Sequence, residues 1–493
     1  MSRRPTVLMM SRGVRIHDIY REMAADLAAD HRVVVLAAPE ERRSFVALGT
    51  VEVRTYRTPD ILSVRTNGHA ASTPELRARA AQIEQAIGLP LYKAASNYLL
   101  YGRIVKSFGG YWNYLDREDD LLRAYVGAYE DLSALFDEIQ PDLVFYDTID
   151  LISNFVAFVL ALRRGIFAID FRFSPLSNGK ISAGFGLYRK NIVMEYLYDH
   201  PEAITPQSYA AADDILDHPR EYLYGTSYAT VNREIFASNR FLNPQKIAAL
   251  LADRRRLAHS LKNVRWYMYG QRNRLWLARH LVTDPPAEPY VVFFLPHLPE
   301  ASTCSQSPRW VYPEAVVEQL AINAPSRLKI VVKEHPRTYG RRGKAFFKPL
   351  QELPNVVACH PMMDNYRLVT GAEAVVAVTG TIGLEGLLLG KRVGVLGRPF
   401  YSVYKGIKQL AYPEEIYTAM NDAAWKPEAM DEERRQFVAA YVQSLHAFGH
   451  GKGTAIYPDT GGEKWAQALR ATMDFIADHH LEPSDFDTGL PQG

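Results

Sequence analysis

Residues 374–391, AVVAVTGTIGLEGLLLGK, decide the fold class of this chain. The Val-rich run at 374–378 predicts a buried strand, and the apolar residues at 382–389 predict a helix. Only a Thr-Gly-Thr turn separates the two. Short strand-to-helix connections of this kind are typical of α/β folds that contain a parallel sheet.

The same alternation runs through the surrounding sequence. It predicts further strands at 290–295, 328–332, 355–358 and 393–396, and helices at 312–322, 343–352 and 364–371. Strands and helices that alternate with short connections build a doubly wound unit. We therefore expect a C-terminal Rossmann-like domain over residues 286–420.

The N-terminal half shows a comparable pattern with longer interruptions. Apolar runs at 6–10 and 33–37 flank a helical pattern, and PDLVFYDTID and GIFAIDF predict later strands on either side of a helix. We expect an N-terminal Rossmann-like domain over 1–285, whose helical insert begins near residue 192. Residues 421–480 should be helices that pack back on this domain, and the polar residues 481–493 a disordered tail. The predicted fold class is α/β, with two doubly wound domains facing one another across a cleft.

Composition narrows the classes of function. The chain of 493 residues is 47% hydrophobic and 23% charged, with a net charge of +2, which argues against a nucleic-acid partner. Its two cysteines, Cys304 and Cys359, fit a reducing cytoplasm. The N-terminal apolar run is too short for a signal peptide, and the run at 155–162 is too short to span a bilayer. We expect a cytoplasmic protein that can rest on the inner face of the cell membrane.

Polar residues follow the predicted strands of the C-terminal domain, at the edge where parallel sheets bind ligands. His297 and Glu300 follow the first strand. The second strand leads into Lys333, His335 and Pro336, and the fourth into Thr379, Gly380 and Thr381. Because these strand ends meet at one edge, we expect the side chains to converge on one site.

The Thr-Gly-Thr turn precedes a helix, so its hydroxyls and backbone N–H groups can cradle an anion. Glu385 lies one helical turn after Thr381, within reach of a ribose beside a bound phosphate. The alternative is that Thr381 caps the helix and Glu385 is solvated.

Lys333 and His335 belong to a strongly basic stretch, residues 326–349. Such a stretch can be a solvated face, and a lone histidine can be structural. At a strand end beside the threonine turn, however, both predict a phosphate or carboxylate ligand. Neither a dinucleotide fingerprint nor a Walker loop is present, and no metal-ligand spacing or cofactor is predicted.

Carboxylates at strand ends of the N-terminal domain are candidates for the base or nucleophile. Asp147 closes one predicted strand, and Asp170 and Arg172 close another, while Glu300 competes from the C-terminal domain. The alternative for Asp147 is the N-cap of the next helix. A basic, aromatic segment at 253–281 either meets anionic lipid or a glycan acceptor, or packs as a core helix.

PHLPEAST, VVKEHP, AVVAVTGTIGLEGLLLGK and VGVLGRPFY together resemble bacterial capsule and surface-polysaccharide glycosyltransferases of the GT-B fold, similar to Kdo transferases that use CMP-Kdo. The resemblance covers mainly residues 290–406. It implies phosphate binding by His335, Pro336, Thr379 and Thr381, and ribose or nucleotide contact by Glu385. HLPE is one residue shorter than the family's first motif, so the resemblance assigns no role to His297 or Glu300.

These observations predict a metal-independent glycosyltransferase that takes a sugar from a nucleotide-activated donor. CMP-Kdo is the first candidate for that donor. The acceptor is a surface or capsular polysaccharide or a glycolipid, on the side of the N-terminal domain, and other polysaccharide-assembly proteins are candidate partners. The predicted catalytic residues are Asp147, Glu300 and His335. His297, Lys333, Gly380 and the residues named above are expected to bind the donor. A nucleotide-sugar epimerase, a cytidine-nucleotide glycerophosphotransferase and a non-catalytic partner of an assembly complex remain alternatives.

Overall fold

The computed structural model describes residues 4–11, 17–56, 73–107, 118–176, 179–224, 268–298, 300, 302–448 and 461–490. The chain forms two compact units. Unit 1 contains residues 1–99, 113–208 and 440–493, and unit 2 contains 100–112 and 209–439. The chain crosses between the units within helices α5 (Ser96–Ser107), α9 (Pro206–Asp217) and α19 (Asp431–Gln443).

Unit 2 is built on a six-stranded sheet in which every pairing is parallel. Its order is β12-β11-β10-β7-β8-β9, so the chain starts in the middle, winds to one edge and then to the other. The strands are β7 (Tyr290–Phe294), β8 (Lys329–Lys333), β9 (Val356–Cys359), β10 (Ala374–Ala377), β11 (Arg392–Val395) and β12 (Ile407–Gln409). The direction of winding reverses between β7 and β10, and this switch point is where such sheets bind ligands.

Unit 1 has a seven-stranded sheet of order β13-β6-β5-β4-β1-β2-β3. Its strands are β1 (Thr6–Met10), β2 (Arg32–Ala37), β3 (Glu52–Thr55), β4 (Leu143–Tyr146), β5 (Phe167–Phe173), β6 (Lys180–Phe185) and β13 (His446–Ala447). β1 to β5 are parallel, whereas β6 and β13 each pair antiparallel with their neighbour. The switch point of this sheet lies between β1 and β4.

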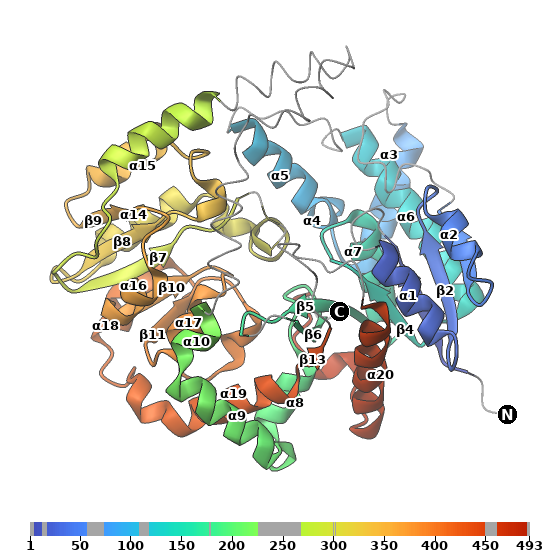
Figure 1. The fold of residues 1–493 in the computed structure, drawn as a ribbon. Helices are drawn as coiled ribbons and strands as arrows, with labels where there is room; N and C mark the ends of the chain where they lie inside the picture. The colour runs from blue at the N-terminus through green and yellow to red at the C-terminus, as the bar shows by residue number, and fades with distance from the viewer. Residues whose placement is uncertain are drawn as a thin grey trace, which may run out of the picture. The chain divides into compact units, whose positions relative to one another are not determined.

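Helices cover the sheets (Figure 1). Unit 1 contains α1 (His17–Leu27), α2 (Arg42–Val46), α3 (Pro74–Ile87), α4 (Leu91–Ala94), α6 (Glu118–Ile139), α7 (Ile152–Arg163), α8 (Ile192–Asp199) and α20 (Gly462–Asp478). Unit 2 contains α10 (Pro219–Tyr224), a helix over 268–280, α14 (Pro313–Asn323), α15 (Lys344–Gln351), α16 (Asn365–Gly371), α17 (Ile382–Leu388) and α18 (Ile416–Asn421). α20, although it comes late in the chain, packs beside α1 (Figure 1).

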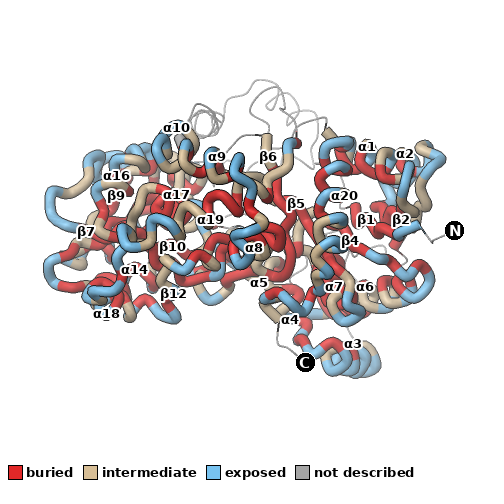
Figure 2. The backbone as a smooth tube through the Cα atoms, turned by 90° about the horizontal axis from the view of Figure 1, so that it is seen from below, coloured by how far each residue is buried: buried red, intermediate tan, exposed pale blue. Residues whose placement is uncertain are grey.

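The core of each unit sits on its sheet. β1, β4 and β10 are buried along their whole length, because helices cover both faces (Figure 2). In unit 2 the two faces form separate apolar clusters, one around Val291 and Phe293 and the other around Val292 and Val375. Two doubly wound Rossmann-like units are therefore present, as the sequence predicts. Their placement across a cleft stays a prediction.

The units divide the chain at different points from those expected. Residues 100–112 already belong to unit 2, and the main segment of that unit begins at residue 209 instead of 286, because it includes α10 and the helix over 268–280. It returns to unit 1 at residue 440 instead of 421. Residues 225–267, most of the expected insert, lie outside the described residues.

The expectation of a disordered tail does not hold for residues 481–490. Phe486 is buried, with its ring against those of Phe167 and Phe185. The backbone N–H of Leu187 donates to the carbonyl of Thr488 (2.8 Å). Polar composition predicted disorder here because one aromatic anchor among polar residues is a weak signal.

Among the residues that the structure describes, no helix is both long enough and apolar enough to cross a membrane.

Candidate functional site

The loops that follow β7, β8 and β10 come together at the switch point of unit 2. β7 pairs with both β8 and β10, so the ends of the three strands are neighbours. This arrangement carries His297, the Lys333–His335 segment and the Thr379–Thr381 turn to one edge of the sheet.

His335 holds a defined tautomer. It is the N-cap of a short 3-10 helix at Pro336–Thr338, and its Nδ1 accepts a hydrogen bond from the backbone N–H of Arg337 (3.1 Å). Burial, followed by the electrostatic influence of the neighbouring His297 and Arg337 side chains, holds the pKa of His335 well below its usual value. The ring is thus neutral at pH 7 and carries its proton on Nε2, which makes it a hydrogen-bond donor.

Glu334 organises the loop around His335. One carboxylate oxygen accepts three hydrogen bonds, from the backbone N–H of His335, the hydroxyl of Thr338 and the guanidinium of Arg342, each at 2.7 Å. Glu334 is fully buried and Arg342 is 3% exposed. A buried ion pair of this kind fixes the loop because neither charge can be left unpaired at low cost.

Arg342 also connects two strand ends. Its second guanidinium nitrogen donates to the carbonyl of Pro296 (2.8 Å), directly before His297. The ring of His297 stacks on that of His335, with centroids 5.1 Å apart and planes inclined by 21°. Burial, with help from Arg341, lowers the pKa of His297 to about 3. Two neutral imidazoles therefore lie face to face beside several arginines.

Lys333 brings a cation to the same edge. It is 3% exposed, and its ammonium group donates to the side-chain oxygen of Asn365, a residue positioned by the Asp364 cap of α16. Burial lowers the pKa of Lys333 to about 8, and the charge that most opposes this lowering is the carboxylate of Glu385. Glu385 from α17 and Lys333 from β8 are thus electrostatic neighbours, as a shared site requires.

Tyr401 anchors the Thr-Gly-Thr turn through a hydrogen bond. The buried Tyr401 hydroxyl donates to the carbonyl of Gly380 (2.5 Å). A side chain at Gly383 would overlap the same tyrosine, so only glycine fits there. Thr381 occupies the N-cap position of α17 but makes no side-chain capping bond, so the alternative of a capping role is not realised. Thr381 and Gly380 are exposed and Thr379 is half-buried.

Several buried polar atoms in the segments after β7 and β8 have no protein hydrogen-bond partner. Among the described residues of unit 2, buried side-chain atoms without a protein hydrogen-bond partner include His297 Nδ1, Thr303 Oγ1, Ser305 Oγ and the second oxygen of Glu334. All four belong to the segments that follow β7 and β8. Such atoms are uncommon in folded proteins and are frequent where a ligand or water completes the structure.

The other predicted carboxylates are placed as follows. Asp147 is half-buried directly after β4, at the switch point of unit 1, and the N-cap of α7 is Leu151 instead. Asp170 does not close its strand: β5 continues to Phe173, and Asp170 is buried in an ion pair with Arg189 (2.6 Å). Burial raises its pKa, so Asp170 fits a structural role. Glu300 is exposed after β7.

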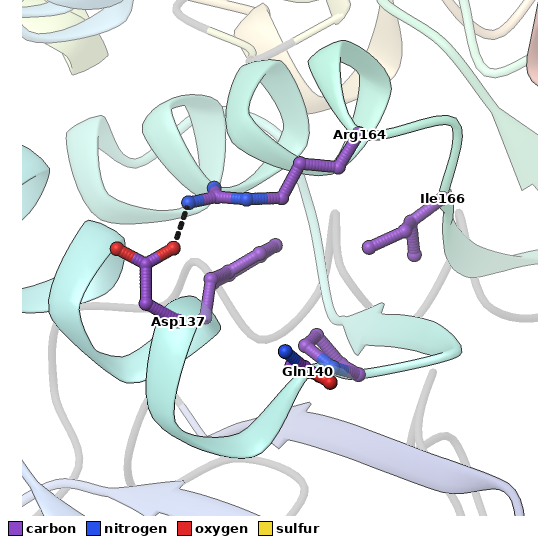
Figure 3. Close-up of a pocket in the computed structure, with 6 residues that line it drawn as sticks. Asp137, Gln140, Arg164 and Ile166 are labelled. Carbon is purple, nitrogen blue, oxygen red and sulfur yellow. Dashed lines mark hydrogen bonds and ion pairs between the residues drawn. The ribbon is translucent and has the colours of Figure 1, made fainter.

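Two further features fall outside the site. In the basic segment, residues 253–267 lie outside the described residues, whereas the helix over 268–280 buries Leu277 in the unit 2 core. A pocket of about 270 Å³ opens at the opposite edge of the unit 1 sheet, between the ends of α6 and α7 (Figure 3). There Arg164 points at Asp137, and their ion pair (2.6 Å) neutralises both charges.

Sequence reasoning missed Glu334, Thr338 and Arg342. They looked like members of a solvated basic run, and no local pattern marked them as buried. An acid between Lys333 and His335 is the one available signal, because a single Glu among eight basic residues is well placed to be their common partner.

The fold and these loops define the class: a chain of two Rossmann-like units, the second with a polar site at its switch point. Residues 310–443 match the family model described as "Capsule polysaccharide biosynthesis protein". This segment contains the loop of His335 and the Thr-Gly-Thr turn. The resemblance to capsule polysaccharide biosynthesis proteins is therefore confirmed over this part of the chain.

Protein FixF of Sinorhizobium fredii (strain NBRC 101917 / NGR234) is 32% identical over 108 residues. The match covers 22% of this chain and 25% of FixF, so the chain spans about a quarter of that relative's length.

Solved structures with some likeness include the KpsC beta Kdo 2,7 transferase of Thermosulfurimonas dismutans, which is 16% identical and covers 75% of this chain and 95% of its own, with a TM-score of 0.34. Anabaena Alr3699/HepE in complex with UDP-glucose is 11% identical over 95% of this chain and 99% of its own, with a TM-score of 0.29. The Neisseria meningitidis UDP-GlcNAc 2-epimerase is 12% identical over 89% and 97%, with a TM-score of 0.25. The fold is established by the strand orders of the two sheets.

Proposed function

We propose that this protein is a glycosyltransferase that moves a sugar from a nucleotide-activated donor to a surface or capsular polysaccharide or a glycolipid. The donor is CMP-Kdo in the first instance. One observation carries the proposal: the neutral His335, stacked on His297 and fixed by the Glu334–Arg342 pair, lies at the strand edge where Lys333 meets Glu385. The match of residues 310–443 to the capsule polysaccharide family supports it.

The chemistry at this edge suits a phosphate. The Nε2–H of His335, the Lys333 ammonium group and the exposed end of the Thr379–Thr381 turn are hydrogen-bond donors, and preorganised donors stabilise charge that develops in a transition state. As the bond between the sugar and the phosphate breaks, negative charge grows on the leaving nucleotide phosphate. Glu385 would contact the ribose or the nucleotide.

The acceptor side is assigned to unit 1. Asp147, at the switch point of its sheet, is the first candidate to deprotonate the acceptor hydroxyl or to attack the anomeric carbon, and Glu300 the second. The reaction would take place in the cytoplasm, at the inner face of the cell membrane, alongside other polysaccharide-assembly proteins. We propose no metal and no cofactor, so excess EDTA should leave the rate unchanged.

Radiolabelled donors test the proposal. CMP-Kdo, other CMP-, UDP- and GDP-sugars and CDP-glycerol are each incubated with capsular polysaccharide or glycolipid acceptors, with wild-type protein and with His335→Ala. We expect label from CMP-Kdo in the acceptor with wild type alone. Conversion of a nucleotide sugar without acceptor would identify an epimerase, and transfer from CDP-glycerol a glycerophosphotransferase. Nucleotide binding without turnover of any donor would indicate that the protein is a non-catalytic partner in a polysaccharide assembly complex.

A further inference from the structure

Unit 1 contains a hydrogen-bonded cluster of a serine, a histidine and a glutamate that the sequence motifs do not reveal. Ser44 Oγ lies 2.8 Å from Nε2 of His17, and Nδ1 of the same ring lies 3.1 Å from the carboxylate of Glu41. The other carboxylate oxygen of Glu41 accepts a hydrogen bond from the hydroxyl of Ser11 (2.5 Å). A ring whose two nitrogens face a hydroxyl and a carboxylate is arranged to take up a proton.

The cluster lies at the edge of the sheet where ligands bind. Ser11 directly follows β1, and its backbone N–H donates to the carbonyl of Leu36 (3.0 Å), which prolongs the pairing with β2. His17 begins α1, and Glu41 and Ser44 stand at the start of α2, after β2. In Figure 1, α1 and α2 lie together with β2. β1 also borders the switch point of unit 1, where Asp147 follows β4.

The ring of His17 is fixed by its neighbours but remains partly exposed to solvent. It packs edge-on against Phe45, with centroids 5.2 Å apart and planes at 80°. Its side chain is 23% exposed, whereas that of Glu41 is 6% exposed. A buried carboxylate behind a partly exposed imidazole orients the ring, and the imidazole stays accessible to a substrate.

Ser44 can serve both protonation states of the ring. Its hydroxyl oxygen lies 2.8 Å from Nε2 and also 2.7 Å from the backbone carbonyl of Glu41. When His17 is neutral, the Ser44 hydroxyl donates to Nε2 while Nδ1–H donates to the Glu41 carboxylate. When His17 is protonated, Nε2–H donates to Ser44 Oγ, and the serine proton turns to the Glu41 carbonyl. Each state is fully hydrogen-bonded, so proton uptake needs no movement of the backbone.

We propose that His17, in place of Asp147 or Glu300, is the general base of the transfer reaction, with Ser44 as proton shuttle and Glu41 as positioning residue. This inference rests on the proposed function. The acceptor hydroxyl gives its proton to Ser44 Oγ while the Ser44 proton passes to Nε2 of His17. The acceptor oxygen forms the new bond to the anomeric carbon, and the electron pair of the broken bond leaves with the nucleotide phosphate. The proton on His17 returns to solvent after the product departs.

Steady-state transfer by four variants of the full chain tests this: His17→Gln, Ser44→Ala, the double variant, and His31→Gln. His31 is a matched control because its Nδ1 also pairs with a carboxylate, that of Asp30 (2.9 Å), ahead of β2 and away from the cluster. General bases contribute about 10²- to 10⁴-fold. We expect His17→Gln to lower kcat at least about 100-fold with the KM for donor unchanged, and His31→Gln to behave as wild type.

Members of one relay are not additive, so the double variant should be no slower than His17→Gln. Imidazole added to His17→Ala should restore part of kcat, which a purely structural histidine would not allow. Wild-type kcat in His17→Gln, or independent multiplicative losses in the double variant, would overturn the inference. If His17→Gln fails to fold, the kcat of Ser44→Ala tests the inference instead, and a wild-type kcat in that variant would overturn it. Labelling of Ser44 by a fluorophosphonate would indicate a nucleophilic serine and also overturn it. A wild-type protein that transfers nothing from any donor would instead refute the proposed function.

Discussion

The guanidinium of Arg342 and the carboxylate of Glu334 form an ion pair of 2.7 Å in which both side chains are almost completely buried. This pair connects the loop that presents His335 to the carbonyl of Pro296, next to His297. The candidate donor site is therefore built on a charge pair that no solvent screens. Its geometry should depend on both members more strongly than on any surface charge nearby.

Removing one partner of this pair should destabilise unit 2. Arg342→Leu leaves the Glu334 carboxylate buried without its cation, which typically costs about 3–5 kcal/mol of unfolding free energy. Urea denaturation followed by circular dichroism measures the loss. Arg327→Leu is the control, because its ion pair with Glu373 is exposed and should matter by less than about 1 kcal/mol. Equal stability of the two variants would show that the buried pair does not hold the loop.

His335→Ala should abolish transfer while the fold survives. The variant removes the Nε2–H donor that we propose faces the leaving phosphate, and a single preorganised donor contributes about 10²- to 10³-fold. We expect kcat to fall by that factor, with an unchanged circular dichroism spectrum. His280→Ala provides the control, because this exposed ring stacks on Trp276 and takes no part in the site. Full activity in His335→Ala would remove the proposed role.

Nucleotide affinity should fall as the pH rises through about 8. Burial lowers the pKa of Lys333 to about 8, so the ammonium group is charged below that pH and becomes neutral above it. The lost positive charge weakens phosphate binding, and the association constant for CMP should fall up to about tenfold for each pH unit above 8 until binding through Lys333 is lost. Titration calorimetry from pH 6.5 to about 9.5 measures this trend. Lys333→Gln should bind weakly with no such pH dependence; an identical decline in that variant would assign the titration to another group.

Gly383→Ala should disturb the Thr-Gly-Thr turn. The added methyl group would overlap the buried Tyr401 ring, and overpacking of this kind costs about 1–3 kcal/mol. Because Tyr401 also holds the carbonyl of Gly380, CMP affinity should fall together with stability. Tyr401→Phe frees space at the hydroxyl, so the double variant should be more stable than the sum of the single losses predicts. Strict additivity would mean that the two residues do not interact.

Five of the six strands of unit 2 could be predicted from the sequence within one or two residues, whereas the three-residue β12 (Ile407–Gln409) was missed. Runs such as LKIVV and AVVAV are short and apolar because these strands are buried on both faces, and the connections between them are short. β3 and β6 were missed for the opposite reason. β3 (Glu52–Thr55) is partly exposed and polar, and β6 (Lys180–Phe185) contains Ser182 and Gly184 and pairs antiparallel at one side of the sheet.

The candidate site was predictable only where it follows strand ends. Lys333, His335 and the Thr379–Thr381 turn could be placed at one edge because parallel strands end there. The buried partnership of Glu334 with Arg342 spans eight residues across a loop, and charge alone does not distinguish it from a solvated pair. The cluster of His17, Glu41 and Ser44 joins residues 24 and 27 positions apart in the sequence, and no local periodicity encodes such a contact.

Thermal unfolding of wild type and His335→Ala with CMP, CDP, UDP and GDP tests the central claim most directly, because a nucleotide that binds the native state raises Tm by mass action. We predict that CMP raises Tm in wild type by several degrees and that His335→Ala loses most of this increase. No shift with any nucleotide, or an equal shift in both proteins, would contradict a nucleotide site at the carboxyl edge of the unit 2 sheet.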